Sequence, residues 1–275
     1  MVLNKFNLSD SLAIITGGAG LLGTKHVEAL IEVGCEVVIF DINEDALNER
    51  KEYFLKKYQK NVLTLKVDIT KENEILRAKR IVFEKFNKNP DILINNAAID
   101  PKFEKNSNIN RSRLENFELA QWNLEISVGL TGAMLCSKIF GYEMAKNEKG
   151  VILNIASDLG VIAPDQRLYK EDGLEYNEQN VKPVTYSVIK HGLIGLTKYI
   201  ATYWADKGVR CNAFAPGGVF NNHHDDFLKK VTSLIPMQRM ANIDEYKASV
   251  LFLCSDASSY MNGATLNMDG GRSAW

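Results

Sequence analysis

The sequence predicts an α/β fold in which helices cover both faces of a parallel sheet. Short apolar segments alternate along the chain with longer amphipathic ones, the order that β-α-β units produce. Most apolar segments are rich in Val, Ile and Leu without polar alternation, as in parallel strands that are buried on both faces. The 275 residues, 45% of them hydrophobic, suffice for one large core but not for two full domains. We therefore expect a single domain over residues 1–275.

Seven strands and six helices are expected. The strands are at 12–16, 35–40, 62–67, 91–96, 150–157, 208–216 and 264–268, and the helices at 21–33, 44–59, 71–88, 114–147, 185–206 and 243–255. Right-handed β-α-β connections bring the carboxyl ends of all parallel strands to one edge of the sheet, where ligands bind. The prediction is thus a Rossmann-type doubly wound domain with a seven-stranded, mostly parallel sheet.

Charge and composition favour a small-molecule partner. The 33 basic residues nearly balance the 34 acidic ones, so nothing indicates a nucleic-acid or anionic-membrane surface. The N-terminus lacks the apolar core of a signal peptide, and no apolar run approaches the roughly 20 residues of a membrane span. We expect a cytoplasmic protein. The four cysteines are widely separated within apolar segments, which favours buried, reduced thiols over disulfides or a metal site.

The segment TGGAGLLG, Thr16–Gly23, indicates a dinucleotide-binding turn. It follows an apolar strand and precedes an amphipathic helix, so glycine would let the backbone approach a pyrophosphate at the helix N-terminus. G-x-G-x-x-G starts at Gly18 and T-G-x-x-G-x-x-G starts at Thr16, whereas T-G-x-x-x-G-x-G would need glycine in place of Leu21. The alternative is a glycine turn that only packs helix against strand.

Asp41 favours NAD over NADP as the cofactor. It ends the second strand 18 residues after Gly23, close to the spacing at which a carboxylate accepts the adenosine ribose hydroxyls and repels a 2′-phosphate. No Arg or Lys lies in the glycine turn or at 41–43 to bind that phosphate. The alternative role, an N-cap of the next helix, suits Asn43 better.

Ser157, Tyr186 and Lys190 are candidates for acid–base chemistry on an alcohol. Tyr186 and Lys190 lie one helical turn apart, and Ser157 ends the fifth strand. A free tyrosine, with a pKa of about 10, is a poor base near neutral pH. An ammonium about 4 Å away contributes roughly 4 kcal/mol at an effective dielectric constant of about 20, or about 3 pKa units before desolvation. Ser157 would stabilise charge on the substrate oxygen. A surface tyrosine, a solvated lysine and a strand-end serine are the alternatives.

The order of these motifs resembles the short-chain dehydrogenase/reductase family, compact one-domain type. The glycine turn, NNAA at 95–98, NIAS at 154–157, YSVIK at 186–190 and PGG at 216–218 follow in the family's order over nearly the whole chain. The resemblance implies an NAD(P)-dependent alcohol–ketone oxidoreductase.

The resemblance also implies site residues. The tetrad would be Asn123, Ser157, Tyr186 and Lys190, with Asn123 holding a water that relays protons from Lys190 to solvent. Asn95 has a structural role as an equal alternative, and Asn221 replaces the family's usual threonine. The implied cofactor contacts are Gly17, Gly20, Leu22, Gly23, Asp41, Ile42, Asp68, Ile69, Asn95, Ala97, Tyr186, Lys190, Pro216, Gly217 and Val219.

Two segments depart from a minimal domain. The insertion, residues 163–184, is polar and charged and lengthens the chain between Ser157 and Tyr186 beyond the family's usual spacing. We expect it to overhang the site, to contact a neighbouring subunit, or to be solvated without a role; its candidates for ligand contact are Arg167, Tyr169, Lys170 and Tyr176.

The lid segment, residues 217–240, is expected to cover the substrate. It contains His223, His224, Asp225 and Asp226, but adjacent residues rarely converge on one ion, so no metal is expected and these side chains would meet a polar substrate instead.

Three hypotheses for the function follow. A finer resemblance, to family members associated with bacterial surface-polysaccharide or flagellin-glycan sugar biosynthesis, favours a sugar, sugar phosphate or nucleotide sugar as substrate. The second is a reductase of an acyl or steroid-like ketone, against which the mixed polarity of 220–238 counts, and the third is a non-catalytic NAD-binding sensor. The apolar faces of 114–147 and 185–206 suggest a homo-oligomer, a tetramer or dimer, although packing on the sheet would explain them too. Leu21 is expected to press on the nicotinamide-side ribose.

Overall fold

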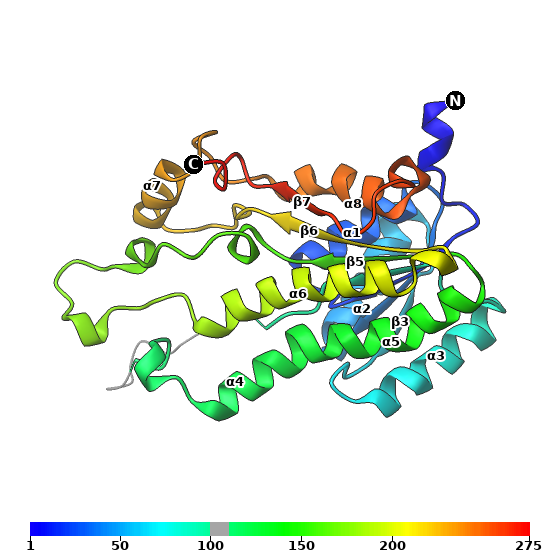
Figure 1. Ribbon diagram of the computed structural model, residues 1–275, viewed down its shortest axis with the longest axis horizontal. Helices are drawn as coiled ribbons and strands as arrows, with labels where there is room; N and C mark the ends of the chain where they lie inside the picture. Colours follow the sequence, from blue (N-terminus) through cyan, green and yellow to red (C-terminus); the bar gives the residue numbers. More distant parts are fainter. Residues whose placement is uncertain (100–109) are drawn as a thin grey trace.

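A seven-stranded sheet, parallel throughout, forms the centre of the computed structural model, which describes residues 1–99 and 110–275 (Figure 1). Its strand order is β3-β2-β1-β4-β5-β6-β7. This confirms the predicted doubly wound sheet. The order reverses between β1 and β4, where a doubly wound sheet opens its ligand crevice. The strands are β1 Leu12–Thr16, β2 Glu36–Asp41, β3 Leu63–Lys66, β4 Ile92–Asn95, β5 Gly150–Ile155, β6 Val209–Pro216 and β7 Thr265–Met268.

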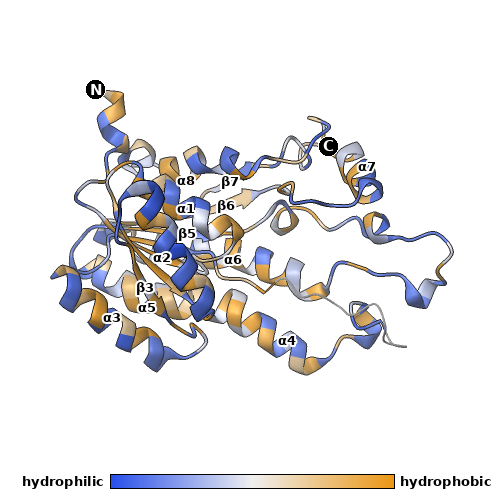
Figure 2. Ribbon diagram, turned by 180° about the vertical axis from the view of Figure 1, so that it is seen from behind, coloured by the Kyte–Doolittle hydropathy of each residue, from blue (hydrophilic) through white to orange (hydrophobic). Residues whose placement is uncertain are grey.

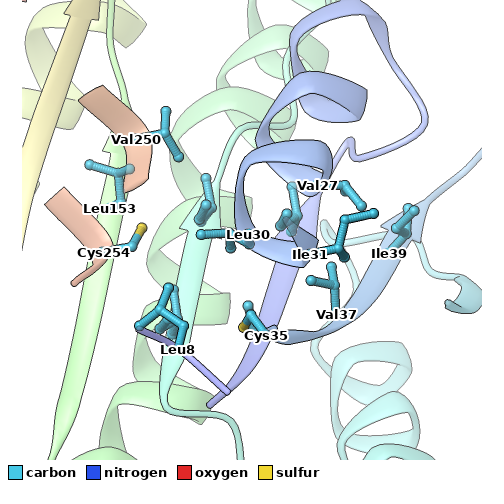
Figure 3. Packing of buried hydrophobic residues seen from close by; sticks show 14 of the residues in the cluster. Leu8, Val27, Leu30, Ile31, Cys35, Val37, Ile39, Leu153, Val250 and Cys254 are labelled. Carbon is cyan, nitrogen blue, oxygen red and sulfur yellow. The ribbon is translucent and has the colours of Figure 1, made fainter. Parts of the chain in front are cut away.

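Helices cover both faces of the sheet, as predicted. Alternate residues of a strand point to opposite faces, so Ala13 and Ile15 of β1 enter one core while Leu12 and Ile14 enter the other. Figure 3 shows part of the first core, between the sheet and helices α1 and α8, and Figure 2 shows the apolar strands inside the more polar outer helices. The first face carries α1 Leu21–Ile31, α2 Glu44–Tyr58 and α8 Lys247–Cys254; the second carries α3 Glu72–Phe86, α5 Gly132–Lys146 and α6 Val184–Tyr203.

The helix predicted over 114–147 is less regular than expected. Residues Leu114–Asn116 form a separate 3-10 turn, after which α4 Leu119–Ile126 runs through a π-helical turn, Ser127–Thr131, into α5. Gly129 in the π turn lies against α6, where a Cβ would come within 2.7 Å of Ile189 Cγ2. The side chain of Ile189 on α6 therefore packs directly on the backbone at Gly129.

Two further helical segments differ from the sequence prediction. The segment 243–255 starts as a 3-10 turn, Ile243–Tyr246, before α8. Helix α7, Asp225–Ser233, was not predicted; it lies within the lid segment. Its nine residues are too few for their periodicity to distinguish a helix from a polar loop.

The continuous helix Leu119–Lys146 is, among the described residues, the one helix long and apolar enough to cross a membrane by length and composition alone. Over half of its most apolar window, 56%, is buried inside the protein. Its α5 part packs on the sheet through Leu135, Cys136, Ile139 and Phe140. Contact with the sheet therefore accounts for the apolar composition. All four cysteines are buried and free, as predicted.

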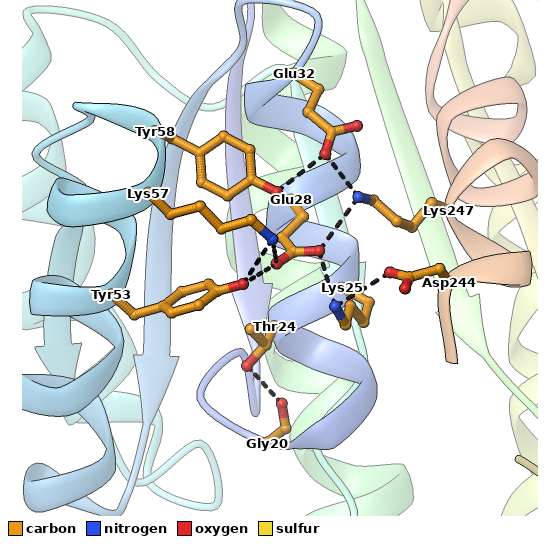
Figure 4. Close-up of polar contacts among 10 residues, drawn as sticks. All are labelled: Gly20, Thr24, Lys25, Glu28, Glu32, Tyr53, Lys57, Tyr58, Asp244 and Lys247. Atoms are coloured by element: carbon orange, nitrogen blue, oxygen red, sulfur yellow. Dashed lines mark hydrogen bonds and ion pairs between the residues drawn. The ribbon is translucent and has the colours of Figure 1, made fainter. Parts of the chain in front are cut away.

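A buried carboxylate, Glu28 of α1, joins three helices (Figure 4). It accepts hydrogen bonds from the Tyr53 hydroxyl and from Lys57 Nζ (3.0 Å) of α2, and it pairs with Lys25 Nζ (3.1 Å) and, from α8, Lys247 Nζ (3.2 Å). Burial alone would raise the pKa of this carboxyl, but the hydrogen bonds from Tyr53 and the lysines outweigh it and lower the pKa to about 2. Because α1 starts at the glycine turn, this network fixes the helix that carries the turn.

Replacing Glu28 by Gln should lower the free energy of unfolding by about 1 to 3 kcal/mol at pH 7, since three lysine ammonium groups lose a buried carboxylate partner. The pKa of Glu28 is depressed from 4.5 to about 2, so the stabilisation is complete above pH 4.5 and is lost as the pH falls towards 2. Urea unfolding of wild type and Glu28→Gln at pH 7, 4 and 3 should show the difference shrinking. Glu32→Gln, at a half-exposed partner of Lys247, is the matched control, and equal losses for both variants would contradict the assignment.

Candidate active site

A cleft of about 770 Å³ lies at the carboxyl edge of the sheet. Its walls come from the segments that end or follow six of the seven strands: 17–23 after β1, 41–42 at β2, 67–69 after β3, 96–99 after β4, 155–159 at β5 and 216–219 at β6. The insertion and the lid segment close one end. This is the position at which open α/β sheets bind ligands.

The glycine turn is so tight that only glycine fits at two of its positions. Gly17 has a φ of +61°, and a Cβ there would lie 2.8 Å from Ala97 Cα. A Cβ on Gly23 would lie 2.2 Å from the carbonyl oxygen of Gly17. Gly17, Gly20 and Gly23 line the cleft, whereas Gly18 packs against Ile39 and is absent from the lining. The T-G-x-x-G-x-x-G register therefore describes the ligand-facing glycines.

Asn96 holds the glycine turn in place. Its Nδ2 donates to the carbonyl oxygens of Thr16 and Gly17, both at 3.0 Å, while Thr16 Oγ1 accepts the N–H groups of Asn96 and Ala97. Asn96 and Ala97 both line the cleft. The loop after β4 thereby fixes the turn after β1 across the point where the strand order reverses.

Asn95, predicted as a cofactor contact, does not line the cleft. Its side chain is buried on the opposite side of β4, where Nδ2 donates to Ser137 Oγ (3.0 Å) and to Asn154 Oδ1 (2.8 Å). Because successive strand residues face opposite sides, Asn95 ties β4 to β5 and α5 while Asn96 serves the cleft. This arrangement favours the structural role, which was the equal alternative for Asn95, and makes Asn96 the residue of the pair that lines the cleft.

Asp41 and Asp68 form the acidic end of the cleft. Asp41 Oδ2 accepts the N–H of Ala19 in the glycine turn (3.2 Å), and Asn43 caps α2, as expected. Asp68 Oδ1 accepts the N–H and hydroxyl of Thr70. Burial would raise the pKa of Asp68, but the bonds from Thr70 and the charge of Lys71 lower it, so the carboxylate is ionised. A glycine turn that admits no Cβ, with a carboxylate at the end of β2, fits a nicotinamide dinucleotide.

Tyr186 and Lys190 of α6 line the other end of the cleft. Lys190 is buried; its Nζ donates to the carbonyl oxygen of Ile155 (2.8 Å) and lies 5.7 Å from the centre of the Tyr186 ring. Burial, together with the positive charge of Lys182, lowers the pKa of Lys190 to about 8. Lys182 Nζ lies 3.9 Å from the centre of the same ring, so two cations flank the phenol of Tyr186.

Ser157 follows β5 directly and lies close to α6. A Cβ on Gly160 would come within 2.8 Å of the Lys190 carbonyl oxygen, so the turn that carries Ser157 packs directly on this helix. Ser157 Oγ donates to Asp158 Oδ1 (2.8 Å), and Asp158 Oδ2 pairs with Arg272 Nη1 (3.0 Å). Sequence reasoning missed the last two residues, because Arg272 is distant in sequence and belongs to no motif.

The structure does not bring Asn123 to this group. Its side chain is exposed on α4 and is not part of the cleft lining, whereas Leu124 and Val128 of the same continuous helix are. Leu124 and Val128 are four residues apart and share a face, and Asn123 is rotated about 100° from that face. The predicted proton relay through Asn123 is therefore not supported.

The other predicted site residues share the cleft. His223 also lines it, stacked on Phe227 with ring centres 5.2 Å apart, but His224 does not. Residues 1–99 and 110–275 contain no group of three or more His, Cys, Asp or Glu side chains able to hold a metal ion. The predicted residues lining the cleft are Gly17, Gly20, Leu22, Gly23, Asp41, Ile42, Asp68, Ile69, Ala97, Ser157, Tyr186, Lys190, Pro216, Gly217 and Val219.

The insertion is polar over most of its length, and Figure 2 shows it extending beyond the sheet. Of its four candidates for ligand contact, only Tyr169 lines the cleft. Arg167 is exposed and paired with Asp165, Tyr176 is exposed, and the carbonyl oxygen of Lys170 accepts a bond from Lys230 of α7. Leu168 of the insertion packs against Val231, Ile235 and Met240, so the insertion and the lid segment form one wall.

Two family models match the chain. Residues 11–169 match the short chain dehydrogenase model, and residues 173–273 match the model described as enoyl-(acyl carrier protein) reductase. The first match alone covers more than half of the chain. The chain belongs to the short-chain dehydrogenase/reductase family. It is therefore an oxidoreductase of a family that binds a nicotinamide cofactor and acts on small molecules.

Relatives in this family differ in substrate. An uncharacterized oxidoreductase of Thermotoga maritima is 31% identical over 98% of this chain and 99% of its own length. A 3β-hydroxysteroid dehydrogenase 2 of Eggerthella lenta is 29% identical, over 98% of this chain and 96% of its own. A 2-dehydro-3-deoxy-D-gluconate 5-dehydrogenase of Bacillus subtilis is also 29% identical, over 97% and 96%. Family membership thus leaves the substrate open and does not establish the link to surface-polysaccharide biosynthesis.

Solved structures of the family differ in cofactor. A short-chain dehydrogenase of Leptospira borgpetersenii with bound NAD+ has a TM-score of 0.81 at 32% identity and covers 98% of this chain and 95% of its own. A gluconate 5-dehydrogenase of Burkholderia cenocepacia, in complex with NADP and tartrate, has a TM-score of 0.82 at 26% identity with both chains covered completely. Both structures share the fold of this chain over nearly its whole length. Because one holds NAD+ and the other NADP, the comparison does not establish which cofactor this chain prefers.

Asn96→Ala should weaken binding of the reduced nicotinamide cofactor by about tenfold, because the glycine turn loses two of its hydrogen bonds. Asn95→Ala, the matched control, should lower the melting temperature while changing the cofactor dissociation constant little. Fluorescence titration and thermal melts of both variants test the distinction. Equal effects of the two variants on cofactor affinity would show that Asn96 has no special part in the cleft.

Proposed function

We propose that this oxidoreductase uses NAD to interconvert an alcohol and a ketone on a sugar, sugar phosphate or nucleotide sugar. The observation that carries the proposal is that Ser157, Tyr186 and Lys190 line the same cleft as the glycine turn and Asp41. The residues proposed to transfer the proton and those proposed to bind the dinucleotide then belong to one site. In this proposal residues 1–275 act as one catalytic domain, and the lid segment covers the substrate.

The chain's own groups handle the proton and the charge on oxygen. Tyr186 would take the hydroxyl proton of the alcohol, or return it to the ketone oxygen, because its ring is flanked by the ammonium groups of Lys182 and Lys190. Ser157 would donate a hydrogen bond to the same oxygen. Lys190 is fixed by its bond to Ile155, which keeps its charge beside the phenol. The nicotinamide, when bound, would accept or supply the hydride.

NAD is the preferred cofactor in this proposal. Asp41 and Asp68 bring negative charge to the end of the cleft near the glycine turn, and the basic residues of the lining, Lys182, Lys190 and Arg272, belong to the catalytic end. A 2′-phosphate beside Asp41 would meet like charge without a basic partner among these lining residues. The ribose hydroxyls of NAD would instead find acceptors.

The catalytic end favours a substrate with an anionic group. Arg272 is paired there with the carboxylate of Asp158, so the excess charge of +2 among these four lining residues is that of Lys182 and Lys190. A phosphate or carboxylate on a sugar would complement that excess. One setting for such a substrate is the synthesis of surface polysaccharides or flagellin glycans. The gluconate-type dehydrogenases among the relatives support a polyhydroxylated acid as well.

A second candidate substrate class is an apolar ketone. Leu168, Phe227, Val231 and Met240 line the cleft and would pack against an acyl chain or a steroid. The wall formed by the insertion and the lid segment therefore has both an apolar and a cationic part. The substrate screen must include both sugar-class compounds and apolar ketones.

We also propose a homo-oligomer, a tetramer or dimer, formed through the continuous helix 119–146 and α6. Their outer surfaces expose Leu119, Tyr142, Tyr199 and Tyr203; the side chains of Leu119 and Tyr199 are 71% and 63% exposed. Apolar and aromatic side chains in such numbers favour association.

The experiment that tests the proposed function is a substrate screen. Sugar phosphates, nucleotide sugars, gluconate-type sugar acids, acyl ketones and steroid ketones are each tested with NAD and with NADP, and nicotinamide absorbance is followed. Highest turnover with NAD and a sugar-class compound is expected. Highest turnover with an acyl or steroid ketone selects the second candidate, and no turnover with any compound counts against both.

Tyr186→Phe should lower kcat by at least about a hundredfold while leaving the dissociation constant of the cofactor nearly unchanged, because only the proton-carrying oxygen is lost. Steady-state rates and cofactor titration measure the two effects. Tyr169→Phe, at a second tyrosine of the cleft, is the matched control and should keep most of the rate. An undiminished rate in Tyr186→Phe would rule out the mechanism.

Asp41→Ala should reduce the preference for NAD over NADP by about tenfold or more, because the like charge that repels the 2′-phosphate is removed. The ratio of kcat/KM for the two cofactors is the measurement. Glu44→Ala, an exposed carboxylate at the start of α2 paired with Lys66, serves as the control. An unchanged ratio in Asp41→Ala would refute the role of Asp41 in cofactor choice.

A further inference from the structure

Three side chains connect the C-terminal segment to Ser157. The hydroxyl of Ser157 donates to Asp158 Oδ1 (2.8 Å), and Arg272 Nη1 donates to Asp158 Oδ2 (3.0 Å). Ser157 and Asp158 are 6% and 3% exposed, and the Arg272 side chain is 9% exposed. All three residues line the cleft. In this arrangement the only hydroxyl proton of Ser157 is given to Asp158 and not to the cleft.

Asp158 therefore competes with a substrate for that proton. Its Oδ1 also accepts the N–H of Leu159 (2.8 Å), so the carboxylate keeps two partners, Leu159 and Arg272, when the serine hydroxyl turns towards the cleft. Without Arg272 it would be a buried charge without a cationic partner, and such a group holds every remaining donor strongly. The charge of Arg272 thus sets how readily the hydroxyl can turn.

We propose that Arg272 is a positioning residue that acts through Asp158 to free the hydroxyl proton of Ser157 for the substrate oxygen. The inference rests on the proposed function, because it takes Ser157 as the donor to that oxygen. Arg272 itself is held in place by Asp269, whose carboxylate accepts the N–H groups of Gly271 (3.0 Å) and Ser273 (2.9 Å), the residues on either side of it.

The same C-terminal segment packs on the lid segment. The N–H of Met237 donates to the carbonyl oxygen of Gly270 (3.1 Å), and Trp275 Nε1 donates to that of Leu234 (3.3 Å). Figure 1 shows the C-terminus beside α7. Arg272 therefore lies between the lid segment and Ser157, so the hydroxyl would be released where the substrate is also covered.

Steady-state kinetics of Arg272→Met test the proposal, with D-gluconate and NAD as the first probe pair and the best substrate of the screen thereafter. The value of kcat should fall about tenfold to a hundredfold, with KM changed less than about threefold, because a transition-state donor is lost and ground-state binding is kept. Adding Asp158→Asn should restore kcat at least about fivefold, since the neutral amide holds the hydroxyl less strongly. A merely structural arginine would show no such rescue.

Arg239→Met is the matched control, because Arg239 pairs with Glu245 outside the cleft lining; its kcat should be unchanged. An unchanged kcat in Arg272→Met, a fall that Asp158→Asn does not reverse, or a rise in KM alone would each overturn the proposal. If Arg272→Met does not fold, the double variant with Asp158→Asn is compared with wild type and with Ser157→Ala instead. Its kcat within about tenfold of wild type supports the proposal, and a kcat as low as that of Ser157→Ala overturns it.

Ser157→Ala in the same assay separates the two levels of the argument. An undiminished rate in Ser157→Ala removes the donor role from the proposed function, and the role of Arg272 falls with it. If kcat falls in Ser157→Ala but is unchanged in Arg272→Met, only the inference about Arg272 is overturned.

Discussion

The close contact between the glycine turn after β1 and the loop after β4 is the constraint on which the cleft depends. Gly17 approaches Ala97 so closely that no Cβ fits, and Asn96 fastens the turn through two carbonyl oxygens. These loops belong to the strands at which the sheet order reverses. Ala19 of the same turn donates its N–H to Asp41, so the end of β2 is tied to this contact as well.

The end of the cleft lined by Tyr186 and Lys190 depends on a second backbone contact. The turn after β5 lies directly on α6 at Gly160, and Lys190 reaches back to Ile155. Ser157, Tyr186 and Lys190 are thus fixed by a strand end and a helix that touch, although the insertion separates them in sequence. The buried positive charge of Lys190 is costly, which its lowered pKa expresses. The same low-dielectric surroundings strengthen the electrostatic interaction of that charge with the Tyr186 ring 5.7 Å away.

Local patterns sufficed to predict the sheet and most helices, and most of the predicted site residues line the cleft. Short apolar runs indicated the positions of the strands. The separation of four residues between Tyr186 and Lys190 placed them one turn apart on the same helix. Local patterns do not show which way a side chain points or which distant segment meets it. Asn95 and Asn96 are identical, adjacent residues, but their side chains lie on opposite sides of β4. Asn123 and Leu124 are neighbours on one helix, but only Leu124 is on the face that lines the cleft. Arg272 reaches Asp158 from 114 residues away, which no local pattern encodes.

In the proposed function, the contact at Gly160 separates the residues that handle the proton from the loop that meets the substrate. Because Gly160 and Lys190 meet directly, the chain between Ser157 and Tyr186 is free to vary in length without moving either group. The insertion uses this freedom to supply Leu168, Tyr169 and Lys182 to the cleft. Exchange of this loop between family members is thus a route by which evolution, or an engineer, could change what is oxidised while the proton-transfer machinery stays intact.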